Sequence, residues 1–399
     1  MFKLVPSEPI TSVPGFQAGA VQAGIKTKNK LDLAILHSEV PCAVAGVFTT
    51  NRIKAAPVVL SQKHLSSGRA QAIVVNSGCA NACVGEQGLA DALEMARLTA
   101  AKLDIAVGDV LVASTGVIGT PLPMDRVRAG IKQIELDPGG GHYLVEAMMT
   151  TDTRPKEVAA RLDVDGVKLT IAGVAKGAGM IHPDLATMLS FVATDALVGV
   201  DFLQSALNKA VDASFNMVSI DGETSPSDCV FLLANGLAGN VPIGFDNGEA
   251  FQQALTGVCT YLAKCIAEDG EGATKLIEVR IEGARNESEA RQAARTIASS
   301  PLVKAAIHGS DPNWGRIVSA LGRSGTELTE NKLDVHLNDI CAMKEGHPTS
   351  SSNEKLRMSL SSSDKVLIKV CLNLGAGQAT AWGCDLSEEY VTINSEYTT

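Results

Sequence analysis

Apolar and charged positions alternate with a period of two in several short stretches of the chain. In 275–283 (KLIEVRIEG) every second side chain is apolar, which predicts a strand with one buried face in an antiparallel sheet. The stretch 71–76 (QAIVVN) is apolar almost throughout, which predicts a strand buried on both faces. The segments with strand character are 31–37, 71–76, 167–177, 229–235, 275–283 and 364–375.

Three longer stretches have the spacing of amphipathic helices. They are 88–103, with a stripe of Leu89, Leu93, Ala96, Ala100 and Leu103; 249–267, with Phe251, Leu255, Val258, Leu262 and Ile266; and 286–299, which opens with Asn286 and Glu289 in capping-box spacing. Strands and helices are intermingled without a strict alternation. We therefore expect an α+β fold in which helices cover sheets, and a surface loop at 346–355.

Composition and charge narrow the class of protein. The chain has 399 residues, of which 45% are hydrophobic and 20% charged, enough for a large core. Its formal net charge of −10 gives no bulk attraction for nucleic acid or an anionic membrane. We see no secretory signal and no apolar run near the ~20 residues that a membrane span needs, so we expect a cytoplasmic protein.

The cysteines and acidic residues give no metal-binding pattern. Nine cysteines at irregular spacing indicate small buried side chains in a reducing compartment. Cys79 and Cys83 have neither a second pair nor a nearby histidine, so they do not predict a zinc site. Asp221 and Asp228 likewise lack further ligands in register. We therefore expect no metal and no resident cofactor.

The stretch 175–196 (AKGAGMIHPDLATMLSFVATDA) holds the candidate chemistry. A glycine-containing turn and Pro183 precede Thr187, which stands at the head of an apolar, strand-like run. A threonine hydroxyl is a poor nucleophile unless a base lies beside it. Cleavage of the Ala186–Thr187 bond would give Thr187 a free α-amine with a pKa of about 7.7–8.0, which can act as that base. Taken alone, however, the pattern favours an ordinary strand threonine, because β-branched residues are common in strands.

Nine motifs, in order along nearly the whole chain, resemble those of the ornithine acetyltransferases, also called glutamate N-acetyltransferases. They are GVFTTN (46–51), NSGCANA (76–82), STGVIG (114–119), TTDTRPK (150–156), KGAGMIHPDLATML (176–189), SIDGETSPSD (219–228), EDGEGATK (268–275), HGSDPNWGRI (308–317) and VTINSEYTT (391–399). The ATML block is the most specific, because it contains the family's point of self-cleavage.

The resemblance implies a helix–sheet–sheet–helix sandwich that cuts itself between Ala186 and Thr187. The products would be an α subunit of residues 1–186 and a β subunit of residues 187–399, assembled as an α2β2 heterotetramer. The implied reaction moves an acetyl group from N-acetylornithine to glutamate. The resemblance leaves open whether acetyl-CoA also serves as an acetyl donor.

The resemblance also assigns roles to individual residues. Thr187 would be the nucleophile, and Thr115 with Gly116 would form the oxyanion hole. The implied substrate contacts are Thr153, Lys176, Thr187, Glu271, Asn394 and Thr399. We expect the Lys176 ammonium to suit a substrate carboxylate and the Glu271 carboxylate to suit the ornithine side chain.

Two other interpretations remain open at this point. A related N-terminal-nucleophile aminopeptidase would use water in place of glutamate as the acceptor. A non-catalytic amino-acid-binding regulator would keep the scaffold without needing the Thr187 hydroxyl. His182 and His308 are acid–base candidates by residue type, but we expect structural roles for both, since an α-amine already supplies a base.

Overall fold

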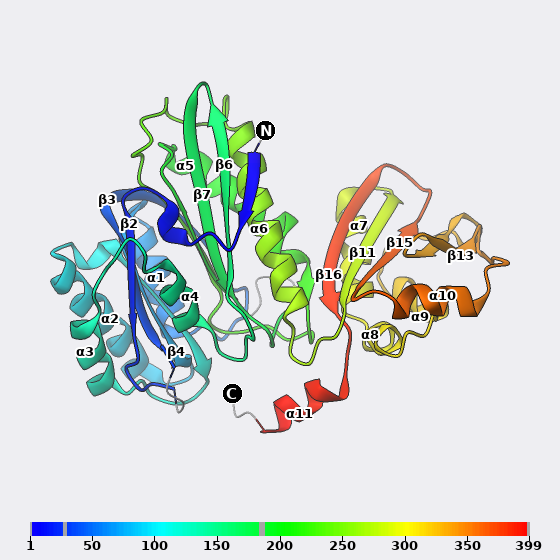
Figure 1. Cartoon of the computed structure of the whole chain (residues 1–399), viewed down its shortest axis with the longest axis horizontal. Helices are drawn as coiled ribbons and strands as arrows, with labels where there is room; N and C mark the ends of the chain where they lie inside the picture. Colours follow the sequence, from blue (N-terminus) through cyan, green and yellow to red (C-terminus); the bar gives the residue numbers. More distant parts are fainter. Residues whose placement is uncertain (1, 27–29, 183–187, 397–399) are drawn as a thin grey trace.

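Two β-sheets with helices on their faces form the protein in the computed structural model, which describes residues 2–26, 30–182 and 188–396 (Figure 1). The first sheet has nine strands. Their order is β1 (Phe2–Pro6), β6 (Lys156–Val164), β7 (Val167–Lys176), β8 (Leu189–Thr194), β10 (Cys229–Ala234), β3 (Leu33–Phe48), β4 (Arg69–Cys79) and β5 (Val110–Val117), with β2 (Phe16–Val21) also paired to β3.

The second sheet has seven strands and is built from the C-terminal half of the chain. Their order is β14 (His347–Pro348), β13 (Ile340–Lys344), β12 (Asp334–Leu337), β15 (Lys365–Cys371), β11 (Leu276–Ala284), β16 (Gly377–Cys384) and β9 (Val218–Ser219). Strand β11 pairs antiparallel with β16 but parallel with β15. The antiparallel prediction for 275–283 is therefore wrong on one side of the strand, because alternation of buried and exposed residues is the same in both directions of pairing.

Strand β3 folds the first sheet into two facing layers. Its pairing with β4 shifts register between His37 and Cys42, and Glu39 and Pro41 in this interval are exposed. The half before the shift pairs with β2 and β4, and the half after it pairs with β10. Buried residues of β4 and β5 share one hydrophobic cluster with buried residues of β7, β8 and β10, so these strands face each other across a core.

The helices that cover the first sheet lie on the outer faces of its two layers, except for α4 (Gly141–Met148), whose buried side chains pack into the core between the layers. The chain's helices are α1 (Ala56–Leu65), α2 (Gly85–Leu103), α3 (Met124–Gln133), α4 (Gly141–Met148), α5 (Val200–Ala213), α6 (Glu249–Glu268), α7 (Glu287–Ala298), α8 (Pro301–His308), α9 (Trp314–Gly322), α10 (Asn353–Ser361) and α11 (Glu388–Glu396), with the short 3-10 helices η1 (Ile10–Ser12), η2 (Val107–Asp109), η3 (Phe215–Met217) and η4 (Glu330–Lys332). Helices α1 and α2 contact β5, whereas α5 contacts β3 and α6 contacts β6 and β7. The α+β class and the helix–sheet–sheet–helix layering predicted from the sequence are both confirmed.

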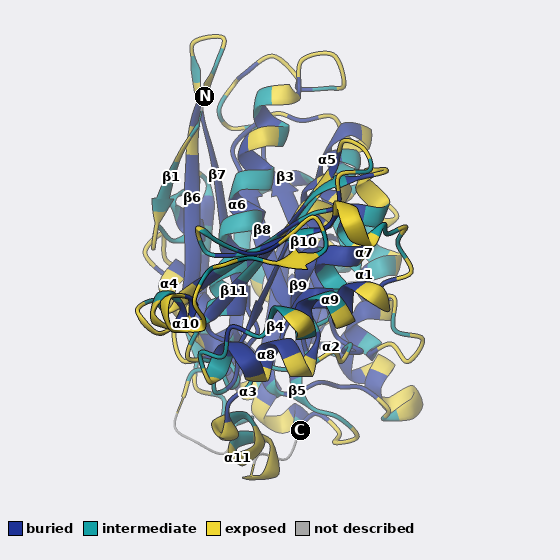
Figure 2. Cartoon of the chain, turned by 90° about the vertical axis from the view of Figure 1, so that its right-hand side faces the viewer, coloured by how far each residue is buried: buried dark blue, intermediate teal, exposed yellow. Residues whose placement is uncertain are grey.

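Helix α6 joins the two sheets. It contacts β6 and β7 of the first sheet and β16 and β9 of the second. The five apolar residues predicted for its buried stripe, Phe251 to Ile266, are all buried. One hydrophobic cluster runs from β7 through α6 to β11, and Figure 2 shows these interior surfaces as dark ribbon. The two sheets therefore share a core.

One helix stripe and one loop boundary differ from the sequence-based expectation. Leu89 is 44% exposed, because α2 turns Gly88, Ala92 and Met95 inward instead. The predicted loop 346–355 ends early, since α10 starts at Asn353 with the Ser352 side chain accepting the Lys355 N–H as its cap. Among the helices of the described residues, none is both long and apolar enough to cross a bilayer.

Candidate active site

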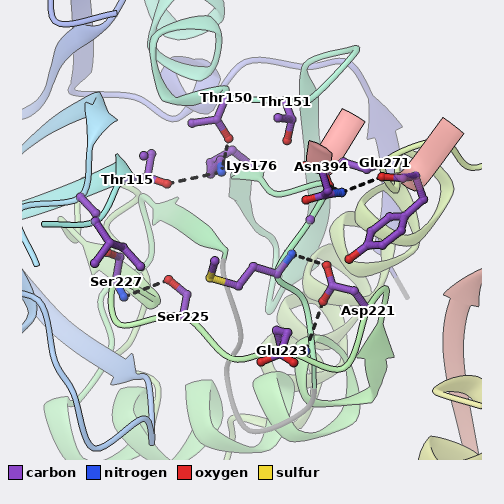
Figure 3. Close-up of a pocket in the computed structure, with 16 residues that line it drawn as sticks. Thr115, Thr150, Thr151, Lys176, Asp221, Glu223, Ser225, Ser227, Glu271 and Asn394 are labelled. Carbon is purple, nitrogen blue, oxygen red and sulfur yellow. Dashed lines mark hydrogen bonds between the residues drawn. The ribbon is translucent and has the colours of Figure 1, made fainter. Parts of the chain in front are cut away.

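The end of β5 and the end of β7 meet in a pocket, although they belong to opposite layers of the first sheet. The pocket is lined by Thr115, Gly116, Lys176, Glu271 and Asn394, five of the residues predicted from the sequence, together with residues that include Thr150, Gly179, Asp221, Glu223 and Tyr390 (Figure 3). These residues come from six separate segments of the chain. Their convergence follows from the fold in β3, which brings the two layers face to face.

Lys176 is a buried ammonium group at one side of this pocket. It is the last residue of β7 and is 2% exposed. Its Nζ donates to Thr150 Oγ1 at 2.7 Å and to Thr115 Oγ1 at 3.4 Å, and lies 3.9 Å from Asp152 Oδ2. Burial lowers the pKa of Lys176, while the Asp152 carboxylate acts in the opposite direction. A cation with neutral hydroxyls as its nearest acceptors is well suited to receive an anionic ligand.

Glu271 and its neighbours form an acidic side of the same pocket. Glu271 Oε2 accepts the Asn394 amide N–H at 2.8 Å, which ties α11 to the pocket wall. Gly179 makes room for this carboxylate, since a Cβ there would lie 2.4 Å from Glu271 Cδ. Asp221 accepts the backbone N–H groups of Met180 and Ile181. Carboxylates in this position favour a cationic side chain over an apolar one.

Asp221 and Tyr390 have pKa values displaced by their surroundings. Burial raises the pKa of Asp221. Burial also raises the pKa of Tyr390, together with the nearby carboxylates of Asp221 and Glu271 and a side-chain hydrogen bond with Asp221. The Tyr390 phenol therefore stays protonated throughout the neutral range and donates its hydrogen bond to Asp221.

The backbone at Gly116, next to Thr115, is held in an unusual conformation. Gly116 has φ of +126°, and its pairing partner on β4, Gly78, has φ of +100°. A Cβ on Gly116 would lie 2.4 Å from the carbonyl carbon of Gly78, so no other residue fits there without moving β4. The paired glycines bring two backbones close together at the pocket wall, where backbone N–H groups can stabilise an oxyanion.

The predicted nucleophile and cleavage point lie outside the described residues, as does Thr399. At Met188 the described structure resumes: its backbone N donates to Asp228 Oδ1 at 2.9 Å, and the chain continues directly into β8. Met188 therefore lies at the sheet end where β7 finishes, since the next residue, Leu189, pairs with Lys176.

Three other residues from the sequence analysis lie away from the pocket lining. Thr153 is exposed and is hydrogen-bonded to Asp269, beside a second hollow that it shares with Lys26 and Thr150. His182 Nδ1 lies 3.1 Å from Ser219 Oγ. His308 Nδ1 lies 2.7 Å from Asp385 Oδ2, near the start of α11. The structural interpretation of His308 is thereby supported. Within the described ranges, no group of three or more His, Cys, Asp or Glu residues is arranged to hold a metal ion.

The comparison with protein families decides the relationship. The ArgJ family model matches residues 17–399. The chain belongs to the ArgJ family. An ArgJ bifunctional arginine biosynthesis protein from Dehalococcoides mccartyi is 53% identical over 401 positions, covering 99% of this chain and 98% of the relative. The Symbiobacterium thermophilum ArgJ is 52% identical over 396 positions, covering 98% of each.

A solved ArgJ structure supports the fold. The crystal structure of the arginine biosynthesis bifunctional protein from Bacillus halodurans is 46% identical, with a TM-score of 0.52. The match covers 100% of that chain but 53% of this one. The solved ArgJ chain therefore corresponds to about half of the present sequence.

Sequence reasoning missed several residues that line the pocket, above all Thr150, Asp221 and Tyr390. Thr150 and Asp221 lie in motifs that were recognised, TTDTRPK and SIDGETSPSD, but were given no role. Tyr390 stands four residues before Asn394, one helical turn away on α11. Its helical spacing from a predicted contact was the signal that could have found it.

Proposed function

We propose that this chain transfers the acetyl group of N2-acetyl-L-ornithine to L-glutamate and releases ornithine and N-acetylglutamate. The reaction proceeds in two half-reactions through an acetyl ester on Thr187. Membership of the ArgJ family and the composition of the pocket support this assignment.

The observation that carries the proposal is the distribution of charge in one small pocket. Lys176 supplies a buried ammonium, while Glu271, Asp221 and Glu223 supply carboxylates in the same lining. An amino acid with a carboxylate and a cationic side chain, as in N-acetylornithine, matches this arrangement. Lys176 binds the α-carboxylate, which both substrates share, and Glu271 binds the ornithine side-chain ammonium.

The chemical step uses a hydroxyl and an amine of the same residue. Thr187 Oγ attacks the acetyl carbonyl carbon, and the Thr187 α-amine accepts the hydroxyl proton. The backbone at Thr115 and Gly116 stabilises the oxyanion. The C–N bond to ornithine then breaks, and the proton passes to the departing amine. Glutamate's amine attacks the ester and restores the free hydroxyl.

The α-amine exists only if the chain cuts itself between Ala186 and Thr187. The proposed fragments are residues 1–186 and 187–399. The second comprises 213 of the 399 residues, or 53%. This is the same share of the chain that the solved Bacillus halodurans chain covers. Two copies of each fragment form the proposed α2β2 assembly. The enzyme works in the cytoplasm and needs no resident cofactor. As a bifunctional enzyme it also accepts acetyl-CoA as a second acetyl donor.

Replacing Thr187 by Ala tests both maturation and turnover. We expect Thr187→Ala to remain one uncut chain by intact-mass measurement and to release no ornithine from N-acetylornithine with or without glutamate. Thr187→Ser keeps a hydroxyl and is the matched control, which should still be cut. Full cleavage of Thr187→Ala would place the nucleophile elsewhere, and wild-type ornithine release that does not depend on glutamate would identify a hydrolase instead.

A further inference from the structure

A buried network of alternating charges lies directly behind the pocket. Lys156, the first residue of β6, places its Nζ 2.7 Å from Asp152 Oδ1 and 2.5 Å from Asp269 Oδ2. The Lys156 and Asp152 side chains are 0% exposed and the Asp269 side chain is 3% exposed. Neither Lys156 nor the two aspartates belongs to the pocket lining among the described residues. The network therefore acts on the site only through other residues.

One end of the network controls the surroundings of Lys176. Asp152 Oδ1 accepts from Lys156 and from the Gly177 N–H at 2.6 Å, while Oδ2 accepts the Thr150 N–H at 3.0 Å. Asp152 is thus closer to Lys156 than to Lys176, whose Nζ is 3.9 Å away. Burial by itself would raise the pKa of Asp152, but the ammonium groups of Lys156 and Lys176 hold it below its ordinary value.

The other end of the network reaches two further predicted contacts. Asp269 accepts both the backbone N–H and the hydroxyl of Thr153. It also stands two residues before Glu271, whose N–H donates to Ala178 O at 2.8 Å. The Lys156 ammonium therefore fixes both carboxylates. Asp152 in turn holds the backbone N–H groups of Thr150 and Gly177, and Asp269 holds Thr153.

We infer that Lys156 is a positioning residue for acetyl transfer, holding Asp152 away from Lys176 so that the Lys176 ammonium stays available to the substrate carboxylate. The inference rests on the proposed function and assigns a role to a residue that touches no substrate. Without Lys156, the Asp152 carboxylate would lose its nearest cation, and Lys176 would become its replacement. A Lys176 paired with Asp152 binds a substrate carboxylate more weakly, because the same positive charge is then shared.

The test compares Lys156→Met with Lys156→Arg, and uses Lys168→Met, an exposed lysine on β7, as the matched control. We expect Lys156→Met to raise the KM of both N-acetylornithine and glutamate roughly 10- to 100-fold, the worth of one charge-assisted hydrogen bond, with a smaller change in kcat. Lys156→Arg retains the charge and should recover most of the loss, while Lys168→Met should match wild type.

A double variant separates positioning from stability. Lys156→Met/Asp269→Asn removes one charge of each sign, so the buried network regains balance and the thermal midpoint should recover. Because Asp152 still lacks its partner, KM should stay above that of the single variant Asp269→Asn, which by itself weakens the contacts of Asp269 with Thr153 and Lys156 but leaves Asp152 paired. A KM that falls to the Asp269→Asn value along with recovered stability would overturn the inference, as would an unchanged KM in Lys156→Met. If Lys156→Met fails to fold, the KM of the double variant decides whether Lys156 is a positioning residue.

Ornithine binding provides a readout that does not depend on turnover. The dissociation constant measured by calorimetry should rise in Lys156→Met by a factor similar to the KM change. A wild-type enzyme that binds ornithine but transfers no acetyl group would refute the proposed function, while the binding series would still decide the role of Lys156. Equal ornithine affinity in wild type and Lys156→Met would refute the positioning role even if acetyl transfer is observed.

Discussion

At the scale of single residues, the site depends on positions where no side chain can be added. Gly116 and Gly78 sit opposite each other on β5 and β4 with positive φ values, and Gly179 leaves the space that the Glu271 carboxylate occupies. Each glycine serves a neighbouring functional group rather than general flexibility. The motifs STGVIG and NSGCANA contain Gly116 and Gly78, but only the pairing of β5 with β4 shows why glycine is needed at these two positions.

Replacing Gly116 by Ala should impair catalysis more than folding. The added Cβ meets the Gly78 backbone and must displace the proposed oxyanion donor, which costs roughly 10²- to 10³-fold in kcat. Gly119→Ala is the matched control, since Gly119 also has a positive φ, yet nothing lies within 4 Å of its Cβ position. Steady-state rates and thermal midpoints of both variants check this expectation, and equal kcat losses in the two would show that backbone strain alone is responsible.

At the scale of elements, the N-terminal end of α11 is anchored beside the second sheet, and its C-terminal part places Asn394 in the pocket lining. Asp385 accepts hydrogen bonds from Thr274 and Lys275 and contacts His308, whose Nε2 lies 3.3 Å from Glu388 Oε2. Figure 1 shows α11 running from the end of β16 back toward the first sheet. The HGSDPNWGRI segment thus holds the helix that carries Asn394, one of the proposed substrate contacts.

His308→Ala should loosen α11 and weaken substrate binding. We expect the KM of N-acetylornithine to rise about 2- to 10-fold, the range for one lost hydrogen bond, while kcat changes less. His308→Asn retains a donor near Asp385 and should lie closer to wild type. His347→Ala, a substitution of an exposed histidine on β14, is the control. A fall in kcat with KM unchanged would point instead to a direct catalytic role for His308.

How far the elements could be predicted depended on the kind of signal. Periodicity located α6 and α7 closely, and the side chain of Asn286 caps α7 by accepting the Glu289 N–H. It could not give the direction of β15 relative to β11, because a period of two is identical in parallel and antiparallel pairs. The fold in β3 was also beyond reach, since the sequence predicted a strand only over 31–37, and the bend in the longer strand is visible only from its pairing partners.

At the scale of the whole molecule, the two sheets are not independent domains, because one hydrophobic cluster includes residues of both. Helix α6 is buried between the first sheet and the second, and the Leu262 side chain lies against Gly173 of β7. The two tryptophans, Trp314 and Trp382, both lie on the side of the second sheet. Their fluorescence therefore reports on the second sheet, whereas circular dichroism reports on every helix.

Leu262→Ala should destabilise both sheets together. Truncating this buried side chain removes about 2–5 kcal/mol from the free energy of unfolding. The unfolding midpoints from tryptophan fluorescence and from circular dichroism should fall by the same amount, because α6 belongs to both cores. Leu302→Ala, at an exposed position on α8, should leave both midpoints unchanged. Midpoints that separate in Leu262→Ala would show that the sheets unfold independently.

The order of strands in the first sheet also constrains how such a protein can be made. Strands β8 and β10, which follow the proposed cut, are inserted between β7 and β3, which precede it. Two halves produced from separate genes would each leave the ribosome with bare interior strand edges, which readily pair with the wrong chain. Synthesis as one polypeptide, followed by folding and only then by scission, lets those edges find each other first. The uncut precursor therefore directs the correct pairing of its own two halves.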